Sequence, residues 1–338
     1  ALGTVCDVVD LVGENRILAS LGLQSFPGDE LPGLKALLAE ASLMAPTMTA
    51  WHLAFVVGPR LNAAGRMGHA EYALSLLLTD DDRRARELAR RLESFNRDRK
   101  RLEEEVATQA AGQISAQAAA GRKTLVGYGA GWHTGVIGIV ASQLAEKYRR
   151  PVILIGVEGG VGRGSCRSVP DFDIHTALTH VAARLTRFGG HSQAAGFEIR
   201  TDEIPAFCEE LETYAREAYT PHRREGDEPA PLPLAAVDEA LVEDLALLEP
   251  TGQGNAEPEF YALTSLANGA GRVFKNAHLE VLADTPDGHI RGIGFNLARE
   301  GNPLAEVRTC GVVYKPQLDR RGGCLLYTSD AADDLLCV

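Results

Sequence analysis

A long stretch without proline, from Asp80 to about Ala119, most restricts the folds open to this chain. Apolar residues recur within it at helical spacing, and aspartates cluster at its start, where carboxylates complement the positive end of a helix dipole. We therefore predict one helix over residues 80–120. A small domain does not need a helix of that length, so we expect it to connect two domains. The apolar positions are Leu88, Leu92, Phe95, Leu102 and Val106.

Residues 121–220 change to a mixed pattern in which strand-like and helix-like segments alternate. This alternation predicts an α/β domain with short turns between its elements. We expect strands at 124–128, 151–157, 161–165 and 194–199, and helices at 135–148, 174–185 and 204–218.

Beyond this domain, residues 221–233 are charged and rich in proline, which predicts a linker. Residues 234–324 show one helix near 238–248 and several short strand candidates separated by Gly and Asn. This pattern favours a small β-barrel. Residues 325–338 break the strand rhythm, so we interpret them as a non-native tail and expect the barrel to be only partial.

The first 79 residues begin with a run rich in β-branched residues, Ala1 to Leu11, which predicts a buried strand. Helices are expected at 15–23 and 34–41, and another should start at Gly58. Asp7 lies inside the predicted strand, where an unpaired charge is costly. A metal ion would explain it, but magnesium or manganese takes oxygen ligands from several carboxylates. The alternative is a polar residue satisfied by its neighbours.

The overall composition is that of an ordinary globular protein of more than one domain, with 338 residues, 45% hydrophobic and 24% charged. No apolar run reaches the roughly 18 to 20 residues of a membrane span, and no basic and apolar leader opens the chain. We therefore predict a cytoplasmic protein without a membrane partner. The six cysteines are scattered, which indicates reduced structural thiols. A net charge of −12 excludes bulk attraction to nucleic acid, so any DNA contact must be a local basic track.

Three segments carry candidate binding residues, and the first is Gly164 to Ser168. It supplies small residues, the hydroxyls of Ser165 and Ser168, and the guanidinium of Arg167 within one tight turn after a strand. Such a turn suits a phosphate group. The alternative is an ordinary β-turn that carries a surface arginine.

The second segment presents His191 after Gly189 and Gly190, which let the backbone turn sharply. His191 could donate to a phosphate or polarise a leaving group, although a lone histidine is often structural. Arg167 and His191 are both expected at strand ends of one α/β unit. Ligands favour the crevice at the carboxyl ends of strands, which supports a shared site.

The third segment contains Arg60, Asn62 and Arg66 around a compact Asn-Ala-Ala-Gly turn, and both arginines could follow a phosphodiester backbone. The alternative is a capped helix whose arginines are only solvated. We apply the same interpretation to the basic residues of the long helix, which we expect on its solvent-exposed face: Arg90, Arg91, Arg97, Arg99, Lys100 and Arg101.

Taken in order, these segments resemble the RecJ branch of the DHH phosphoesterase superfamily, from Ala1 to about Gly323. The run ALGTVCDVVDL is similar to the fourth phosphoesterase motif, in which the residue matching Asp7 is a metal ligand, although Asp10 replaces the usual proline. GPRLNAAGRM, followed by Gly-His-Ala, is similar to a RecJ-specific segment whose first arginine, matched by Arg60, contacts the DNA strand. The chain would thus begin with the end of a DHH phosphoesterase domain.

GWHTGVIGIVAS, GSCRS and FGGHSQAAGF resemble the three signatures of the DHH-associated domain, with Cys166 where Gly or Ala is commoner. The resemblance implies that Ser165, Arg167 and His191 bind the scissile or terminal phosphate, with His133 nearby. LEPTGQGNAEPEF and NAHLEV resemble the opening of the RecJ oligonucleotide-binding (OB-fold) barrel, with Thr251 where Phe is usual. Such barrels hold single strands by stacking and a basic groove.

The implied function is a manganese- or magnesium-dependent 5′ to 3′ exonuclease for single-stranded DNA, acting in DNA repair and recombination. The family's remaining metal ligands should precede position 1, so we expect a fragment that is inactive alone. A single-strand-binding protein or a helicase could deliver its substrate. One alternative is a nanoRNA or cyclic-dinucleotide phosphodiesterase of the same superfamily, which would usually lack the barrel and the long helix. The other is a non-catalytic single-stranded nucleic-acid-binding protein.

Overall fold

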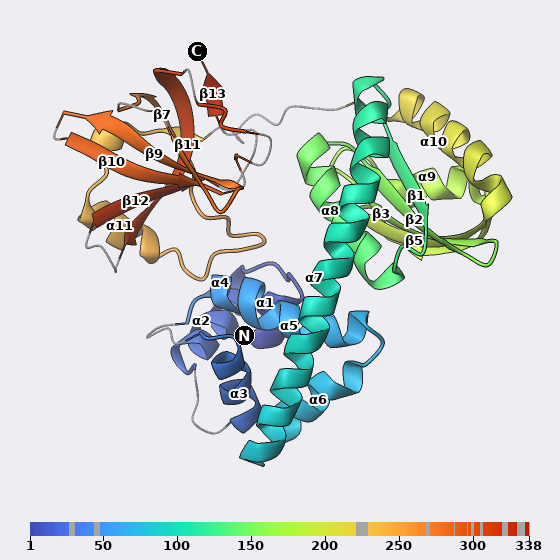
Figure 1. The fold of residues 1–338 in the computed structure, drawn as a ribbon, viewed down its shortest axis with the longest axis horizontal. Coiled ribbons are helices and arrows are strands. Elements are labelled where there is room, and N and C mark those ends of the chain that lie inside the picture. Colours follow the sequence, from blue (N-terminus) through green and yellow to red (C-terminus); the bar gives the residue numbers. More distant parts are fainter. Residues whose placement is uncertain are drawn as a thin grey trace. The chain divides into compact units, whose positions relative to one another are not determined.

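A computed structural model describes residues 1–26, 31–43, 48–220, 229–267, 271–286, 288–295, 297–298, 301–304, 307–319, 324–329 and 335–337 (Figure 1). The chain divides into two compact units. The first comprises Ala1–Phe26, Pro46–Phe55 and Arg224–Val338, and the second comprises Pro27–Ala45 and Val56–Arg223. Each unit is described by itself below. No helix of the described residues is both long enough and apolar enough to cross a membrane.

The second unit is built on helix α7, Asp82–Ala119, which confirms the long helix predicted from the apolar spacing. Its first turn is capped by Asp81, whose carboxylate accepts hydrogen bonds from the backbone N–H groups of Arg83 and Arg84. Three short helices pack on its first half and cover its apolar stripe: α3 (Pro32–Glu40), α5 (Gly58–Arg66) and α6 (Ala70–Leu78).

A five-stranded sheet forms the rest of this unit, in the order β1-β2-β3-β5-β4. Its first two strands are parallel and the other neighbours are antiparallel. The predicted α/β domain is therefore confirmed. The strands are β1 (Leu125–Ala130), β2 (Val152–Glu158), β3 (Val161–Arg167), β4 (Leu185–Gly190) and β5 (Ala194–Arg200).

Helices cover both faces of this sheet, because successive strand residues point to opposite sides. Leu125 packs with α7 and α8 (Thr134–Tyr148), whereas the next residue, Val126, packs in a separate core with α9 and α10 (Figure 1). Helix α10 spans Ile204–Ala218 as predicted. Helix α9 spans only Ile174–His180, so the helix predicted to Leu185 is wrong at its end. A 3-10 turn over Ala182–Arg184 follows, and Leu185 already starts β4.

The outer edge of β1 is closed by side chains of α7. The Gln117 amide accepts a hydrogen bond from Val126 N (2.9 Å) and donates one to Val126 O (2.6 Å). Gln113 makes the same pair of bonds with Tyr128, at 3.1 and 3.0 Å. Gln113 and Gln117, four residues apart on α7, thus bond to Tyr128 and Val126, two residues apart on β1, because the two spacings are of similar length. The glutamines take the place of a neighbouring strand and attach the sheet to the long helix.

The first unit opens with two helices, α1 (Leu2–Cys6) and α2 (Gly13–Gln24). The strand predicted over residues 1–11 is therefore wrong. A strand needs a neighbour for its backbone hydrogen bonds, and the named strands of the described residues begin only at Leu125. A helix satisfies those bonds within the segment. Asp7 is the C-cap of α1 and is exposed to solvent instead of buried.

The first unit also contains α4 (Ala50–His52), and its described residues from 229 onward form a β-domain that includes the short helix α11 (Glu239–Ala246), close to the predicted position. The strands form one sheet in the order β6-β7-β11-β12-β10-β9-β8, with β13 paired to β11. Among the described strands this order is an open path. The strands are β6 (Ala230–Pro231), β7 (Phe260–Ser265), β8 (Arg272–Phe274), β9 (His278–Thr285), β10 (Gly288–Gly294), β11 (Thr309–Asp319), β12 (Cys324–Ser329) and β13 (Leu335–Cys337).

Two predictions about chain organisation concern this unit. Most of the predicted linker, residues 221–228, lies outside the described residues. The predicted non-native tail, 325–338, contains most of β12 and all of β13. Its origin stays a prediction, because a strand can be formed by any sequence with a suitable apolar pattern.

Candidate nucleic-acid interface

Ser165 and Arg167 lie inside strand β3, where the sequence predicted a tight turn after a strand. That prediction is wrong because the segment is paired on both sides: Ser165 lies opposite Leu154 of β2 and opposite Gly196 of β5. Its backbone N–H groups therefore belong to the sheet. A phosphate bound here would be held by side chains.

The side chains of Ser165 and Arg167 share one face of the sheet and contact each other, with Arg167 Nη1 donating to Ser165 Oγ at 3.1 Å. Arg167 also donates to the Cys166 carbonyl at 2.8 Å. The Cys166 thiol points to the opposite face, where it is buried, and burial raises its pKa. Burial also lowers the pKa of Arg167 below its ordinary value. Its guanidinium is thus partly withdrawn from water, which strengthens its attraction to an anion.

Two glycines of α8 let this helix approach the site closely. A Cβ at Gly138 would lie 2.9 Å from Arg167 Nη2 and 3.0 Å from Ser165 Oγ. One turn earlier, a Cβ at Gly135 would lie 2.2 Å from the carbonyl oxygen of Arg66. The start of α8 therefore packs on β3 and on α5 at once. These glycines set the distance between the two candidate segments.

Arg66 reaches the same end of α8, because its Nη1 donates to the Gly135 carbonyl at 3.2 Å. His133 caps this helix, with Nδ1 accepting the Gly135 N–H at 3.0 Å. The structure thus brings together Arg66, His133, Ser165 and Arg167. The Asn-Ala-Ala-Gly sequence is not the predicted turn, since it lies within helix α5.

Arg60 and Asn62 lie on the same helix but take different positions. The Arg60 guanidinium is held by Glu93 of α7, with 2.7 Å between Nε and Oε2, and also donates to the Val56 carbonyl at 2.8 Å. Asn62 is exposed on α5. Of the two arginines in this segment, Arg66 is therefore the one that contacts α8. Contact between Arg60 and a DNA strand stays a prediction.

Arg99 is a residue of this region that the sequence interpretation missed. It was expected on the exposed face of the long helix, but it is only 8% exposed. Its Nε and Nη2 donate to Asn96 Oδ1, and its Nη1 donates to Glu103 Oε2 at 2.5 Å. The signal was available, because Asn96, Arg99 and Glu103 continue the spacing of the apolar positions Leu92 and Val106.

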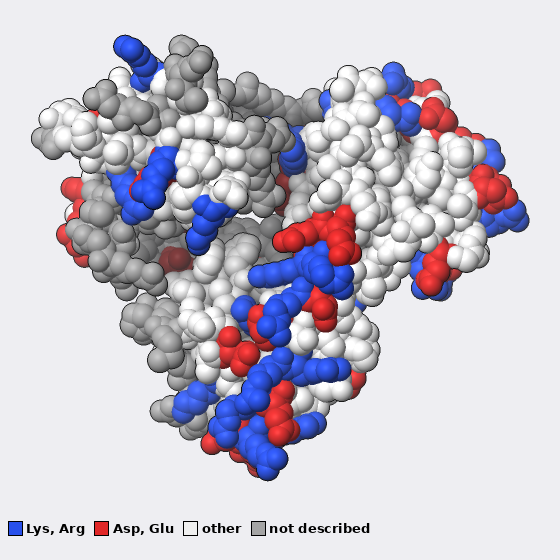
Figure 2. Space-filling view, in the orientation of Figure 1, with Lys and Arg blue, Asp and Glu red and all other residues white. Residues whose placement is uncertain are grey.

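A cluster of positive charge results at the start of α8. The pKa of Arg66 is lowered by burial and then by the charges of Arg99 and Arg167, and only Glu103 acts in the opposite direction. The guanidiniums of Arg99 and Arg167 thus both act on that of Arg66, beside the carboxylate of Glu103, and an anionic ligand would relieve this arrangement. The other basic residues of α7 behave as expected. Arg101, for example, pairs with Glu105 on the solvent side, and basic and acidic side chains lie beside each other over this helix in Figure 2.

His191 follows β4 and is exposed, with Nδ1 accepting the Gln193 N–H at 3.3 Å. The two glycines before it lie in strand β4 instead of the predicted loop. Gly190 has φ 146°, and a Cβ there would lie 2.4 Å from the Ala194 carbonyl oxygen, so only glycine fits. Ser168 N donates to the Gln193 carbonyl at 2.9 Å, which holds the end of β3 beside the turn that carries His191.

On the face of the sheet where α8 packs against β2 and β3, residues of β3, β4 and β5 line a pocket of about 500 Å³. Gly189 and Gly196 form its floor, and Arg163, Arg187 and Glu198 line it. None of these three charged residues was proposed from the sequence. Alternation along β3 could have indicated Arg163, because it lies two residues before Ser165 and thus on the same face.

The described residues do not form a metal centre. They include no group of three or more His, Cys, Asp or Glu side chains that could hold a metal ion. Asp7 is exposed and offers one carboxylate, which is not enough for magnesium or manganese. The role of Asp7 as a ligand therefore stays a prediction.

Two known domain families match this chain. A DHHA1 domain matches residues 121–217, and a RecJ OB domain matches residues 230–323. The single-stranded-DNA-specific exonuclease RecJ of Thermus thermophilus is 40% identical over 265 residues, 77% of this chain and 37% of that protein. RecJ of Escherichia coli is 34% identical over 338 residues, 96% of this chain and 58% of that protein. The chain is thus similar to RecJ proteins over most of its own length.

Solved structures agree with this relationship. The structure of Thermus thermophilus RecJ in complex with Mg²⁺ matches with a TM-score of 0.83 and 33% identity, covering 100% of this chain and 51% of that one. The same protein in complex with Mn²⁺ gives a TM-score of 0.82. The chain spans about half the length of the RecJ proteins it matches. The predicted order of a DHH-associated α/β domain and an OB-fold domain is thereby confirmed.

Proposed function

We propose that this chain is the strand-binding part of an exonuclease that removes nucleotides from the 5′ end of single-stranded DNA. The observation that carries the proposal is the contact between Ser165 and Arg167 on β3, under the first turns of α8. A hydroxyl and a planar guanidinium side by side suit two oxygens of one phosphate. The RecJ relatives are named single-stranded-DNA-specific exonucleases.

The charge of the site favours a terminal phosphate. Arg66, Arg99 and Arg167 are opposed by Glu103, which leaves an excess of positive charge in a partly desolvated place. A terminal phosphate carries more negative charge than an internal phosphodiester, so it gains more from this cluster. An enzyme that starts from a 5′ phosphate would use such a preference to select strand ends.

His191 is the proposed catalytic residue of this chain. Because its Nδ1 accepts the Gln193 N–H, the neutral ring carries its proton on Nε2. That N–H can donate a hydrogen bond to a phosphate oxygen or polarise a leaving group. Gly190 fixes the backbone that presents the ring.

The proposal includes manganese or magnesium as the cofactor, because structures of Thermus thermophilus RecJ are in complex with Mg²⁺ and Mn²⁺. The described residues do not suffice to hold such an ion. We also propose that the protein works in the cytoplasm and that a single-strand-binding protein or a helicase delivers the strand. The described OB-domain strands offer the surface for single-stranded DNA.

The RecJ OB domain also bears on the alternative enzyme. A nanoRNA or cyclic-dinucleotide phosphodiesterase has no use for a strand-binding module after residue 230. The test is competition against a fluorescent 5′-phosphorylated oligothymidylate bound to the purified chain. Unlabelled single strands should displace it, whereas duplex DNA and a cyclic dinucleotide should not. Displacement by the cyclic dinucleotide at equal concentration would contradict the proposal. Manganese-dependent degradation of the strand by this chain alone would contradict the proposal that the chain binds single-stranded DNA without cleaving it.

A further inference from the structure

Arg163 and Arg187 both reach one carboxylate, that of Glu198, on the strand between them. Glu198 of β5 lies opposite Arg163 of β3 and opposite Arg187 of β4. Arg163 Nε lies 3.1 Å from Glu198 Oε1, and Arg187 Nη2 donates to the same oxygen. The two guanidiniums are exposed, and this row carries two positive charges against one negative charge.

A row of small residues, which includes Ser165 of the phosphate site, lies next to these arginines. Ser165 lies opposite Gly196, and Gly196 lies opposite Gly189. A Cβ at Gly189 would meet nothing within 4 Å, and a Cβ at Gly196 would meet only the Gly164 carbonyl oxygen at 3.6 Å. Packing therefore does not require glycine at either position. What the glycines provide is the floor of the open pocket of about 500 Å³, a volume typical of small-molecule sites.

The spacing of the rows matches a nucleotide strand. Residues two apart on a β-strand are joined by six covalent bonds between their Cα atoms and lie about 6.6 Å apart. Successive phosphorus atoms of a nucleic acid are also joined by six covalent bonds. An extended nucleotide strand that follows β3 thus advances by one phosphate for each row. Arg163 is one row from Ser165.

We propose that Arg163 and Arg187 form a second phosphate subsite, which binds the phosphodiester adjacent to the phosphate held by Ser165 and Arg167. The intervening sugar crosses the floor made by Gly189 and Gly196. Glu198 holds both guanidiniums in place without a strand and competes with the phosphodiester when one is bound. This inference rests on the proposed function, because it extends the same strand along the sheet.

The test compares ligands with one phosphate and with two. Binding of pdT and pdTpdT to the purified chain is measured by competition against a fluorescent 5′-phosphorylated oligothymidylate. The double variant Arg163→Gln/Arg187→Gln should bind pdTpdT at least tenfold more weakly and pdT unchanged. Its salt dependence for the oligonucleotide should fall by about 0.7 in logarithmic slope, the value for one phosphate contact on a single strand. Arg83→Gln removes an exposed arginine paired with Glu87 on α7 and should change neither affinity.

Two further variants test whether weaker binding comes from loss of a specific phosphate subsite or only from loss of positive charge. Glu198→Gln should tighten pdTpdT binding severalfold, because the competing carboxylate is removed. Gly189→Leu places a side chain in open space, so it should weaken pdTpdT binding while leaving the melting temperature unchanged. Equal losses for pdT and pdTpdT in the arginine double variant, or no loss for either, would overturn the second subsite. Failure of the wild-type chain to bind any of these ligands would overturn the proposed function as well.

Discussion

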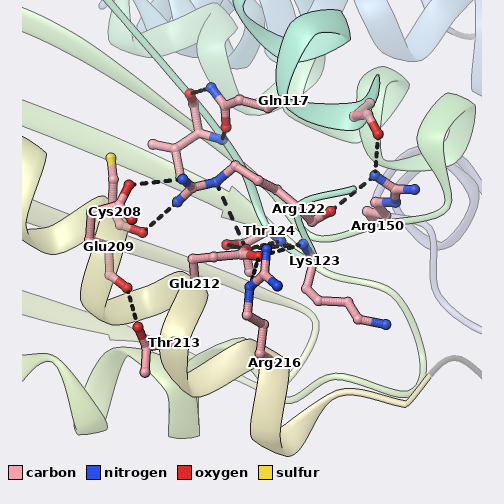
Figure 3. Close-up of polar contacts among 12 residues, drawn as sticks. Gln117, Arg122, Lys123, Thr124, Arg150, Cys208, Glu209, Glu212, Thr213 and Arg216 are labelled. Atoms are coloured by element: carbon pink, nitrogen blue, oxygen red, sulfur yellow. Dashed lines mark hydrogen bonds and ion pairs between the residues drawn. The ribbon is translucent and has the colours of Figure 1, made fainter. Parts of the chain in front are cut away.

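Glu212 of α10 accepts hydrogen bonds from both the backbone N–H and the hydroxyl of Thr124, each at 3.0 Å (Figure 3). The Lys123 N–H donates to the same carboxylate at 3.0 Å, and Arg216 pairs with it at 2.9 Å. Its side chain is 5% exposed. A buried carboxylate therefore fixes the residues just before β1 to the helix on the far side of the sheet.

Glu212→Gln should lower the free energy of unfolding by about 2 to 4 kcal/mol, because a buried charge that several donors satisfy is replaced by a weaker acceptor. Denaturant unfolding followed by circular dichroism measures this loss. Glu209→Gln is the matched control on the same helix, since its side chain is 72% exposed and it pairs with Arg122 at the surface. Equal destabilisation by both changes would show that burial of Glu212 has no special role.

The same carboxylate predicts a pH dependence. Burial alone would raise the pKa of Glu212, but hydrogen bonds from Thr124 and Lys123 outweigh burial and lower it below its ordinary value of 4.5. A lowered pKa in the folded state gives stability that is present above 4.5 and is lost as the pH falls through the folded pKa. The stability difference between wild type and Glu212→Gln should therefore shrink below about pH 4.5. A difference that stays constant down to pH 3 would be inconsistent with this assignment.

The two glutamines that close the edge of β1 should differ in importance. Gln117 bonds the backbone of Val126, which is 2% exposed, whereas Gln113 bonds that of Tyr128, which is 46% exposed. Water can replace Gln113 but has little access to Val126. Gln117→Ala should cost about 2 to 3 kcal/mol and Gln113→Ala less than about 1 kcal/mol. The reverse order in thermal or denaturant unfolding would refute the idea that these side chains replace a missing strand.

Replacement of Gly138 should affect binding of a 5′-phosphorylated strand more than it affects folding. A Cβ there would press on Arg167 Nη2 and Ser165 Oγ, which are ends of movable side chains. Gly138→Ala should therefore displace the phosphate ligands and weaken binding of a 5′-phosphorylated strand by about tenfold, while the protein remains folded. Gly112→Ala on α7 is the control, because its Cβ would meet nothing within 4 Å and alanine favours a helix. Equal affinities of the two variants would contradict the expected displacement.

The elements of the α/β domain could be predicted from the sequence because their signals are local. The spacing of Leu88, Leu92 and Val106 gave helix α7, and the alternation of strands and helices gave most of the sheet. Pairing between distant segments carries no such local signal. The Gly164–Ser168 segment therefore looked like a turn, although β2 and β5 hold most of it as a strand.

The candidate site was only partly visible from the sequence for the same reason. Ser165, Arg167 and His191 belong to short motifs, so their types and order indicated them. Arg99 looked like one more solvated arginine until its register with Leu92 placed it inside the packed face of α7. Asp7 shows the opposite failure, since an apolar run around a carboxylate was interpreted as a buried strand and is a short helix with an exposed end.

The most direct test of the central claim is the affinity of the chain for a 5′-phosphorylated oligothymidylate relative to the same strand without the phosphate. The wild-type chain should prefer the phosphorylated strand, and Arg167→Gln should remove that preference, because Arg167 and Ser165 hold the terminal phosphate. If Arg167→Gln weakens both strands by the same factor and leaves the preference intact, Arg167 only follows the backbone and the terminal phosphate is bound elsewhere.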